Sequence, residues 1–295
     1  MIQPRELSSD TSPSARHFGR MLERRWRDGF FLCVGLDPEY SQMPAFLKQG
    51  TEEEAIEESY YAFCRAIVEA TAESVCAFKP NLAFFEQIGP PGLKALKRLG
   101  DYLRSRFPEI PLILDAKRGD IASTNKGYVA SLFDYFGGDA VTVQPYLGGD
   151  ALAPYLERAE KGVFILCRTS NPGSAELQML SVGAEGTPLY LKVAQLAAND
   201  WNHNRNVGLV AGATYPAELA QIRAIAPDVP LLVPGVGAQG GDLDAVLKYG
   251  RDSQGYGLII NSSRGIIYAG KDETFAEAAK LAAGKLAEDI KARID

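Results

Sequence analysis

Charged residues follow a short apolar run in the stretch from Pro111 to Ile121. Residues 112–114 predict a buried strand, because they form a continuous apolar run that ends before a glycine-containing turn. Asp115, Lys117 and Asp120 come directly after this run. Side chains two apart on a strand point to the same side, so we expect Asp115 and Lys117 to project together as an ion pair. A solvated charge pair at a strand end would give the same pattern, so the rest of the chain is needed to distinguish a functional pair from a solvated one.

Seven further apolar runs predict strands, and helical patterns alternate with them. The predicted strands are residues 30–35, 75–78, 112–114, 140–143, 163–167, 207–211, 230–233 and 256–260. The predicted helices are residues 14–27, 53–73, 92–106, 123–136, 152–161, 189–203, 216–226 and 273–293. Strand–helix alternation predicts a parallel sheet, and eight repeats predict an α/β fold of the (β/α)8 TIM-barrel type with an extra N-terminal helix. A doubly wound open sheet is the alternative, but no GxGxxG motif follows the first strand.

Composition limits the classes of protein that this chain can belong to. Its 295 residues are 46% hydrophobic and carry a net charge of −6, which weighs against general nucleic-acid binding. We expect residues 1–14 to be a disordered tail and residues 15–295 to form a single barrel domain. No apolar segment has the length of a signal peptide or a membrane span, which predicts a cytoplasmic protein. Four cysteines without CxxC spacing predict buried free thiols.

The ends of the predicted strands carry most of the polar residues that could do chemistry. In (β/α)8 barrels the active site lies at the carboxyl ends of the strands, so these residues should meet at one mouth. They are Asp37, Lys79, Asp115, Lys117, Ser170, Gln239 and Arg264.

The loops after the seventh and eighth strands predict a phosphate site. Residues 235–241 include four glycines, whose backbone amides can approach an anion closely, and Arg264 follows the next strand. Barrel enzymes frequently hold a phosphate between these two loops.

The alternating charges at the mouth leave several chemistries open. A Mg²⁺ site built from Asp37 and Asp115 with water is one, and a Schiff-base lysine at Lys79 or Lys117 is another. However, two histidines and separated carboxylates form no evident metal ligand set. A lysine flanked by carboxylates stays protonated, which favours an acid or electrostatic role.

The motif Asp115-Ala-Lys-Arg-Gly-Asp120-Ile resembles the Asp-x-Lys-x-x-Asp-Ile signature of the orotidine 5'-phosphate decarboxylase family, in its longer bacterial subgroup. The resemblance extends nearly end to end. It includes Val34-Gly-Leu-Asp37-Pro, Phe78-Lys79-Pro-Asn81, Thr169-Ser170-Asn-Pro-Gly, Pro234-Gly-Val-Gly-Ala-Gln239-Gly-Gly and Ser263-Arg264-Gly. The chain departs from the short-form family at Ser263, where those members usually have glycine.

The resemblance implies the decarboxylation of orotidine 5'-phosphate to uridine 5'-phosphate and CO2 in pyrimidine nucleotide synthesis, without cofactor or metal. It implies that Lys117 stabilises the carbanion at C6 and protonates it, that Asp115 lies beside the departing carboxylate, and that Lys79 and Asp120 complete the charge network. The implied substrate contacts are Asp37 and Thr124 to the ribose, Ser170 to the pyrimidine, Gln239 and Arg264 to the phosphate, and a further contact from Asn81.

The same resemblance implies an obligate homodimer in which Asp120 and Thr124 enter the partner's site. Asp120 lies an odd number of residues past Lys117 at the turn into a helix, so it need not face the same pocket. Two alternatives stay open: a Mg²⁺-dependent sugar-phosphate lyase or aldolase on the same barrel, and a catalytically silent nucleotide-binding protein.

Overall fold

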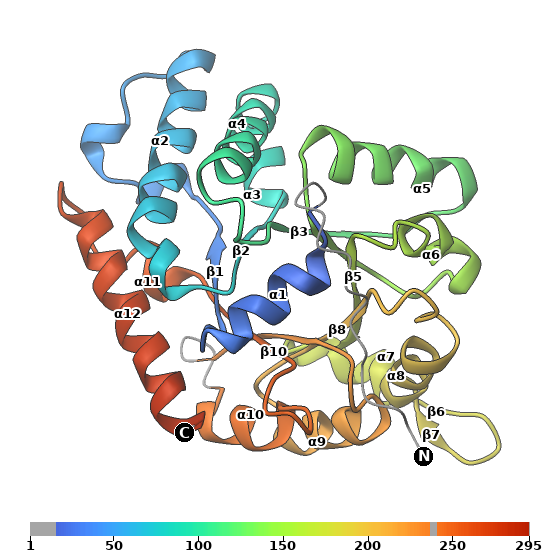
Figure 1. The fold of residues 1–295 in the computed structure, drawn as a ribbon. Coiled ribbons are helices and arrows are strands. Elements are labelled where there is room, and N and C mark those ends of the chain that lie inside the picture. Colours follow the sequence, from blue (N-terminus) through green and yellow to red (C-terminus); the bar gives the residue numbers. More distant parts are fainter. Residues whose placement is uncertain (1–15, 237–240, 295) are drawn as a thin grey trace.

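Eight parallel strands form the centre of the computed structural model, which describes residues 16–236 and 241–294 (Figure 1). The strands are β1 (Leu32–Leu36), β2 (Ala77–Pro80), β3 (Ile113–Arg118), β4 (Ala140–Val143), β5 (Gly162–Arg168), β8 (Val207–Ala211), β9 (Leu231–Pro234) and β10 (Leu258–Ser262). They follow the order β2-β1-β10-β9-β8-β5-β4-β3 around the sheet.

The two edge strands of this order, β2 and β3, meet and close the barrel. Parallel bridges join Phe78 to Leu112 and Asn81 to Asp115 across the seam. The predicted (β/α)8 barrel is therefore confirmed, and the doubly wound open sheet is wrong.

Helices surround the barrel and connect its strands (Figure 1). They are α1 (Phe18–Arg27), α2 (Glu53–Thr71), α3 (Ala83–Glu86), α4 (Pro90–Arg106), α5 (Ala122–Val129), α6 (Gly149–Leu156), α7 (Ala175–Gln178), α8 (Leu189–Asn199), α9 (Pro216–Ile225), α10 (Leu243–Gly250), α11 (Arg264–Ile267) and α12 (Phe275–Ile294). A π-helical turn, Ala130–Tyr135, extends α5. A small antiparallel hairpin, β6 (Ser181–Val182) with β7 (Thr187–Pro188), lies between β5 and α8.

Two helical predictions need correction. The sequence pattern predicts no helix between the seventh and eighth strands, yet α10 lies there. Its signal is Asp242, whose Oδ1 accepts hydrogen bonds from the backbone N–H groups of Asp244 and Ala245 as an N-cap. The predicted helix at 123–136 is α5 followed by the π-helical turn, a change of hydrogen-bond register that apolar spacing does not reveal.

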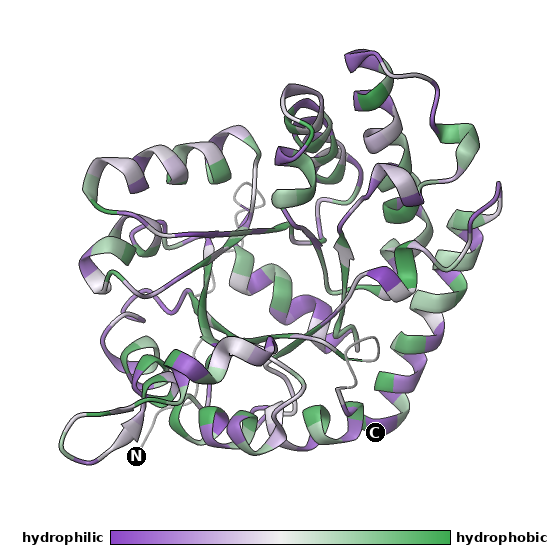
Figure 2. Cartoon of the chain, turned by 180° about the vertical axis from the view of Figure 1, so that it is seen from behind, coloured by the Kyte–Doolittle hydropathy of each residue, from purple (hydrophilic) through white to green (hydrophobic). Residues whose placement is uncertain are grey.

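Apolar burial follows the layers of the barrel. Every residue of β1, β4 and β8 is buried, because side chains of a parallel barrel strand face either the interior or the surrounding helices. Figure 2 shows the hydrophobic strands at the centre and the hydrophilic residues on the outer sides of the helices. The four cysteines are buried free thiols, as predicted.

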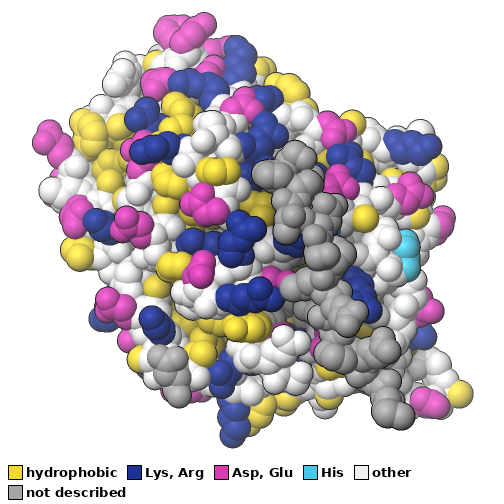
Figure 3. Space-filling view, viewed as in Figure 1, with side chains coloured by type: hydrophobic (Ala, Val, Ile, Leu, Met, Phe, Trp, Pro, Cys, Tyr) yellow, Lys and Arg dark blue, Asp and Glu magenta, His cyan; other side chains and the backbone are white. Residues whose placement is uncertain are grey.

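The extra N-terminal helix α1 covers the amino-terminal end of the barrel. Trp26 donates from Nε1 to the Leu258 carbonyl at 2.7 Å, and Arg25 donates from Nε to the Val75 carbonyl at 2.9 Å. Both carbonyls lie at or just before the first residue of a strand. Lys and Arg side chains gather on this face of the molecule (Figure 3). That basic surface is therefore at the end of the barrel opposite the strand ends that carry the predicted site.

The predicted disordered tail, residues 1–14, lies outside the described residues, so the proposed division into a tail and a domain over 15–295 stays a prediction. Among the helices that the structure describes, none combines the length and the apolar character needed to cross a membrane.

Candidate functional site

Two adjoining cavities open at the carboxyl ends of the strands. The first, of about 250 Å³, is bordered by Asp37, Gly235, Asn261 and Arg264. The second, of about 380 Å³, is bordered by Lys117, Thr142, Ser170 and Gln178. Lys79, Asp115 and Pro234 border both cavities. Lys79 and Asp115 therefore stand where the cavities meet, with Lys117 beside them in the second cavity, an arrangement that suits an elongated ligand whose reacting atom lies at its middle.

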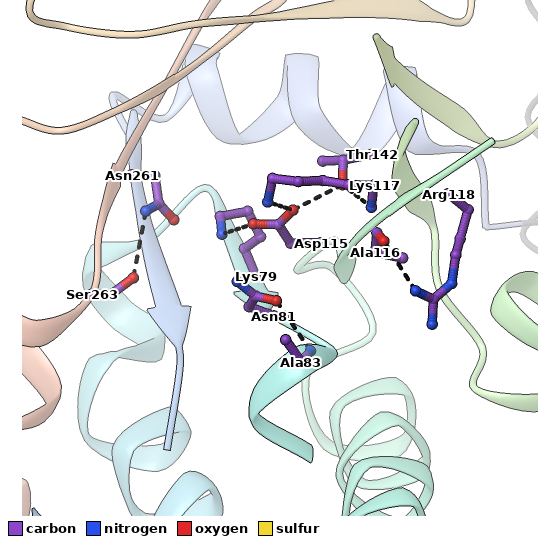
Figure 4. A network of polar contacts seen from close by, with 10 residues as sticks. All are labelled: Lys79, Asn81, Ala83, Asp115, Ala116, Lys117, Arg118, Thr142, Asn261 and Ser263. Atoms are coloured by element: carbon purple, nitrogen blue, oxygen red, sulfur yellow. Dashed lines mark hydrogen bonds and ion pairs between the residues drawn. The ribbon is translucent and has the colours of Figure 1, made fainter. Parts of the chain in front are cut away.

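A carboxylate between two ammonium groups forms the centre of the site (Figure 4). Lys79 Nζ lies 2.8 Å from Asp115 Oδ2, and Lys117 Nζ lies 2.6 Å from Asp115 Oδ1. The side chains of Lys79 and Asp115 are only 5% and 10% exposed, whereas that of Lys117 is 48% exposed. The Lys117 ammonium is therefore accessible to a ligand, whereas the Lys79 ammonium contacts the Asp115 carboxylate on its buried side.

Each buried charge shifts the pKa of its neighbour. Burial by itself would raise the pKa of Asp115, but Lys79 and Lys117 outweigh it and hold that pKa well below its usual value. Burial would lower the pKa of Lys79, but Asp115 and then Asp37 raise it above its usual value. Both groups are consequently ionised at neutral pH, and the prediction that Lys79 serves in an electrostatic role is favoured over a Schiff-base role.

Backbone geometry at the end of β3 turns Lys117 toward Asp115. The pairing of β3 with β4 shifts register between Leu114 and Arg118, so that the strand bulges there. Lys117 has φ of +46°, in the left-handed region that residues with a Cβ rarely adopt. Thr142 of β4, which the sequence analysis missed, donates from Oγ1 to Asp115 Oδ1 at 2.8 Å. Its sequence signal is a single polar residue in the otherwise apolar run of β4.

The first cavity carries the predicted ribose and phosphate residues. Asp37 Oδ1 is buried without a hydrogen-bond partner among the described residues, as is Asn261 Oδ1. Such orphaned acceptors suit the hydroxyl groups of a bound ligand. Arg264 begins α11 and is exposed at the cavity edge, where its guanidinium can reach an anion. Asn261 was missed by the sequence analysis because it ends an apolar strand as a lone amide.

Tyr268 fixes the Asp37 loop against α11. Its hydroxyl accepts from the Glu39 backbone N–H at 2.6 Å and donates to the Asp37 carbonyl at 3.0 Å. Ser263, where the chain departs from the short-form pattern, has φ of −118°, which any residue adopts. An added Cβ at Gly35 would lie 1.8 Å from Ser263 Oγ, so the glycine of β1 makes room for this serine.

The second cavity carries Ser170 on a loop that part-buried polar groups hold in place. Gln178 Oε1 accepts from the Thr169 backbone N–H at 2.9 Å, and Gln178 Nε2 donates to Thr169 Oγ1 at 2.8 Å. Arg168 is buried beneath this loop and lies 3.8 Å from the centre of the Tyr215 ring. Leu166, Val210 and Leu232 supply apolar walls, which suit a planar ring.

Three predicted residues do not border either cavity in the single chain. Asn81 accepts from the Ala83 backbone N–H at 3.2 Å and so caps α3. Asp120 accepts from the Ile121 backbone N–H at 2.7 Å, apart from the Lys79–Asp115–Lys117 cluster. Thr124 is exposed on α5. Gln239 lies outside the described residues, as does much of the glycine loop.

The donor set at the junction of the cavities does not favour a metal ion. Asp115 uses one oxygen for each lysine, and two ammonium groups repel a cation. In the described ranges, no three or more His, Cys, Asp or Glu side chains gather as ligands.

Comparison with known proteins gives consistent matches. A family model described as "Orotidine 5'-phosphate decarboxylase / HUMPS family" matches residues 31–279. Orotidine 5'-phosphate decarboxylase of Azoarcus sp. (strain BH72) is 51% identical over 278 residues, which are 94% of this chain and 99% of that protein. The protein of the same name from Janthinobacterium sp. (strain Marseille) is 50% identical over 252 residues, which are 85% of this chain and 89% of that protein.

A solved structure agrees with these relatives. The structure of Leishmania donovani OMP decarboxylase superimposes with a TM-score of 0.80 at 40% identity, covering 94% of this chain and 98% of that one. The match covers nearly all of both chains.

The buried Asp115 carboxylate generates a prediction about stability. Asp115→Asn removes the carboxylate that pairs with the buried Lys79, and we expect the free energy of unfolding at pH 7 to fall by about 3 kcal/mol. Because folding lowers the pKa of Asp115, its stabilising effect is complete above the usual value of 3.8 and is lost as the pH falls through the lower folded pKa. The difference between wild type and variant should therefore shrink only in acid. Urea unfolding from pH 7 to pH 2.5 measures it.

Asp134→Asn is the matched control, because Asp134 pairs with Arg158 while exposed to solvent. We expect that change to cost less than about 1 kcal/mol. Equal stability of Asp115→Asn and wild type at pH 7 would contradict the role of Asp115 as the counter-charge.

Proposed function

The chain belongs to the orotidine 5'-phosphate decarboxylase / HUMPS family, and from this premise we propose that it converts orotidine 5'-phosphate to uridine 5'-phosphate and CO2. The observation that carries the proposal is the Lys79–Asp115–Lys117 cluster at the junction of two cavities. One cavity offers Asp37 and Arg264 to a sugar phosphate, and the other offers Ser170 and apolar walls to a pyrimidine ring. The ring carbon C6, which carries the carboxylate and adjoins the ring nitrogen that bears the ribose, then lies beside Lys117.

Loss of CO2 from that carbon leaves an electron pair localised on the ring, with no neighbouring position to accept it. We propose that Lys117 stabilises this carbanion, because its ammonium is exposed to the cavity and held by Asp115. A preorganised cation in a site with little water is worth several kcal/mol of transition-state stabilisation. Lys117 then donates a proton to the carbon and completes the product.

In this proposal Asp115 and Lys79 assist Lys117. Asp115 keeps its charge next to the departing carboxylate and orients the Lys117 ammonium. Lys79 keeps Asp115 ionised, because its own ammonium is buried 2.8 Å away. Contacts with the phosphate by Arg264 and with the ribose by Asp37 are remote from the bond that breaks. Their binding energy can hold the substrate in the reactive position.

We also propose a homodimer whose two sites are shared. Asp120 and Thr124 border neither cavity, yet the residues around them offer an apolar surface: Ile121 is 59%, Tyr146 82% and Leu147 42% exposed. Gln144 connects the two loops, donating from Nε2 to the Gly119 carbonyl at 3.2 Å. Exposed apolar groups clustered in this way are typical of an interface. A second copy seated there would receive Asp120 and Thr124 near its own site.

The reaction as proposed uses neither metal nor cofactor, and we place it in the cytoplasm as the sequence analysis expected. Chelation separates it from a Mg²⁺-dependent sugar-phosphate lyase or aldolase. A nucleotide-binding protein without activity would bind uridine 5'-phosphate but release no CO2.

Replacement of Lys117 tests the proposed reaction. In Lys117→Ala we expect kcat to fall by more than about a thousandfold, because the exposed ammonium beside the ring carbon is lost. The decrease of orotidine absorbance with time measures the rate. Lys280→Ala, on the exposed side of α12, is the matched control and should keep wild-type turnover. Near-normal turnover by Lys117→Ala, in protein whose unfolding curve matches wild type, would refute the assigned role.

Chelation distinguishes the proposed reaction from the metal-dependent alternative. We expect CO2 release from orotidine 5'-phosphate to continue unchanged after dialysis against EDTA, because the cations at the site are lysines. Activity that disappears with EDTA and returns with Mg²⁺ would support the lyase or aldolase instead.

Mixing two inactive variants tests the shared site. Lys117→Ala and Asp120→Ala subunits, unfolded together and refolded, should regain about a quarter of wild-type activity, since half of the dimers are mixed and each holds one intact site. Each variant refolded alone is the control. A mixture as inactive as the separate variants would contradict assembly of the site from two subunits.

A further inference from the structure

The bulge in β3 brings three residues opposite one residue of β4. Leu114 pairs with Val141, and Arg118 is the next β3 residue to pair, with Val143. Residues 115–117 therefore face Thr142 alone. A bulge of this kind interrupts the ladder and leaves backbone groups without their usual carbonyl partner. Inside a barrel such a group must find another partner, because an unpaired buried N–H is costly.

The hydroxyl of Thr142 supplies that partner. The Lys117 backbone N–H donates to Thr142 Oγ1 at 3.0 Å, and the hydroxyl donates its only proton to Asp115 Oδ1 at 2.8 Å. A hydroxyl can do both at once, since it has one proton and two lone pairs. Thr142 itself is 1% exposed, so its position is fixed by packing on all sides.

These bonds hold Lys117 at both of its ends (Figure 4). Its amide is bound by Thr142, and its ammonium is bound by Asp115 Oδ1, the oxygen that also accepts from Thr142. The backbone between them has φ of +46°, a conformation that a lysine keeps only when its surroundings determine it.

We propose that Thr142 is a positioning residue for the decarboxylation, whose hydroxyl holds the Lys117 backbone in its left-handed conformation and Asp115 Oδ1 in line with the Lys117 ammonium. The inference rests on the proposed function, because the proposed function gives the catalytic role to Lys117, the cation that Thr142 positions. It goes beyond that function by naming a β4 residue that carries no charge. Thr142 acts through Lys117 and Asp115, and the phosphate and ribose contacts come from other strands.

The test compares two substitutions that separate the hydroxyl from the shape of the side chain. Thr142→Val keeps the branched shape and removes the hydroxyl, so Lys117 N–H loses its acceptor. We expect kcat to fall by about thirtyfold, since small displacements of a reacting group are costly, while KM and the Kd for uridine 5'-phosphate change less than about threefold. Thr142→Ser keeps the hydroxyl, and its kcat should stay within about threefold of wild type.

Thr71→Val is the matched control for removal of a buried threonine hydroxyl. Thr71 Oγ1 donates to the Ile67 carbonyl within α2, away from both cavities. Its removal should leave kcat unchanged. A crystal structure of Thr142→Val adds a readout independent of activity. In it we expect the Lys117 backbone to leave the left-handed region or the Lys117–Asp115 bond to lengthen.

Several results would overturn the proposal: wild-type kcat in Thr142→Val, an equal loss in Thr142→Ser and Thr142→Val, or a loss confined to KM. If Thr142→Val does not fold, a fall in kcat of more than about tenfold in Thr142→Ser would also overturn the proposal. Absence of CO2 release by the wild-type enzyme would instead refute the proposed function. The crystal structure would then still decide the positioning role, since an unmoved Lys117 in Thr142→Val contradicts it.

Discussion

A buried carboxylate with an ammonium on each oxygen is the constraint on which the rest of this structure depends. Removing Asp115 from water costs several kcal/mol unless opposite charges and hydrogen bonds replace the water. Lys79 from β2, Lys117 from β3 and Thr142 from β4 do so together. The same residue also lies on the seam of the barrel, where the Leu82 backbone N–H donates to the Asp115 carbonyl at 3.2 Å. Asp115 therefore takes part both in closing the barrel and in the charge cluster.

The two lysines that pair with Asp115 differ in their exposure to solvent. Lys79 is enclosed and Lys117 is half exposed, although both pair with the same carboxylate. The buried ammonium of Lys79 keeps Asp115 ionised at neutral pH, and the exposed ammonium of Lys117 stays accessible to a ligand. The low-dielectric surroundings that make the cluster costly also make its field strong where the ring carbon would lie.

The two ends of the barrel have different roles. At the amino-terminal end, α1 covers the strands through bonds from Arg25 and Trp26 to backbone carbonyls. At the carboxyl end, loops keep their polar groups directed into the two cavities, and Tyr268 and Gln178 hold those loops. The apolar residues around Asp120 lie along this second end, which is where the proposed dimer would join its sites.

The sequence by itself determined the barrel, its eight strands and the placing of Asp115 and Lys117 at the end of one of them, because alternation and strand periodicity are local properties of the chain. The ends of the predicted strands added Asp37, Ser170 and Arg264, the family resemblance added their roles, and the structure brings each of them to a cavity edge. Only the tertiary structure decided that Lys79 is buried while Lys117 is exposed, and that Thr142 and Asn261 join the site. Those facts depend on contacts between strands distant in sequence and on a bulge with left-handed backbone at Lys117. Such a bulge has no local sequence signal here, because lysine is a residue that disfavours the conformation it is held in.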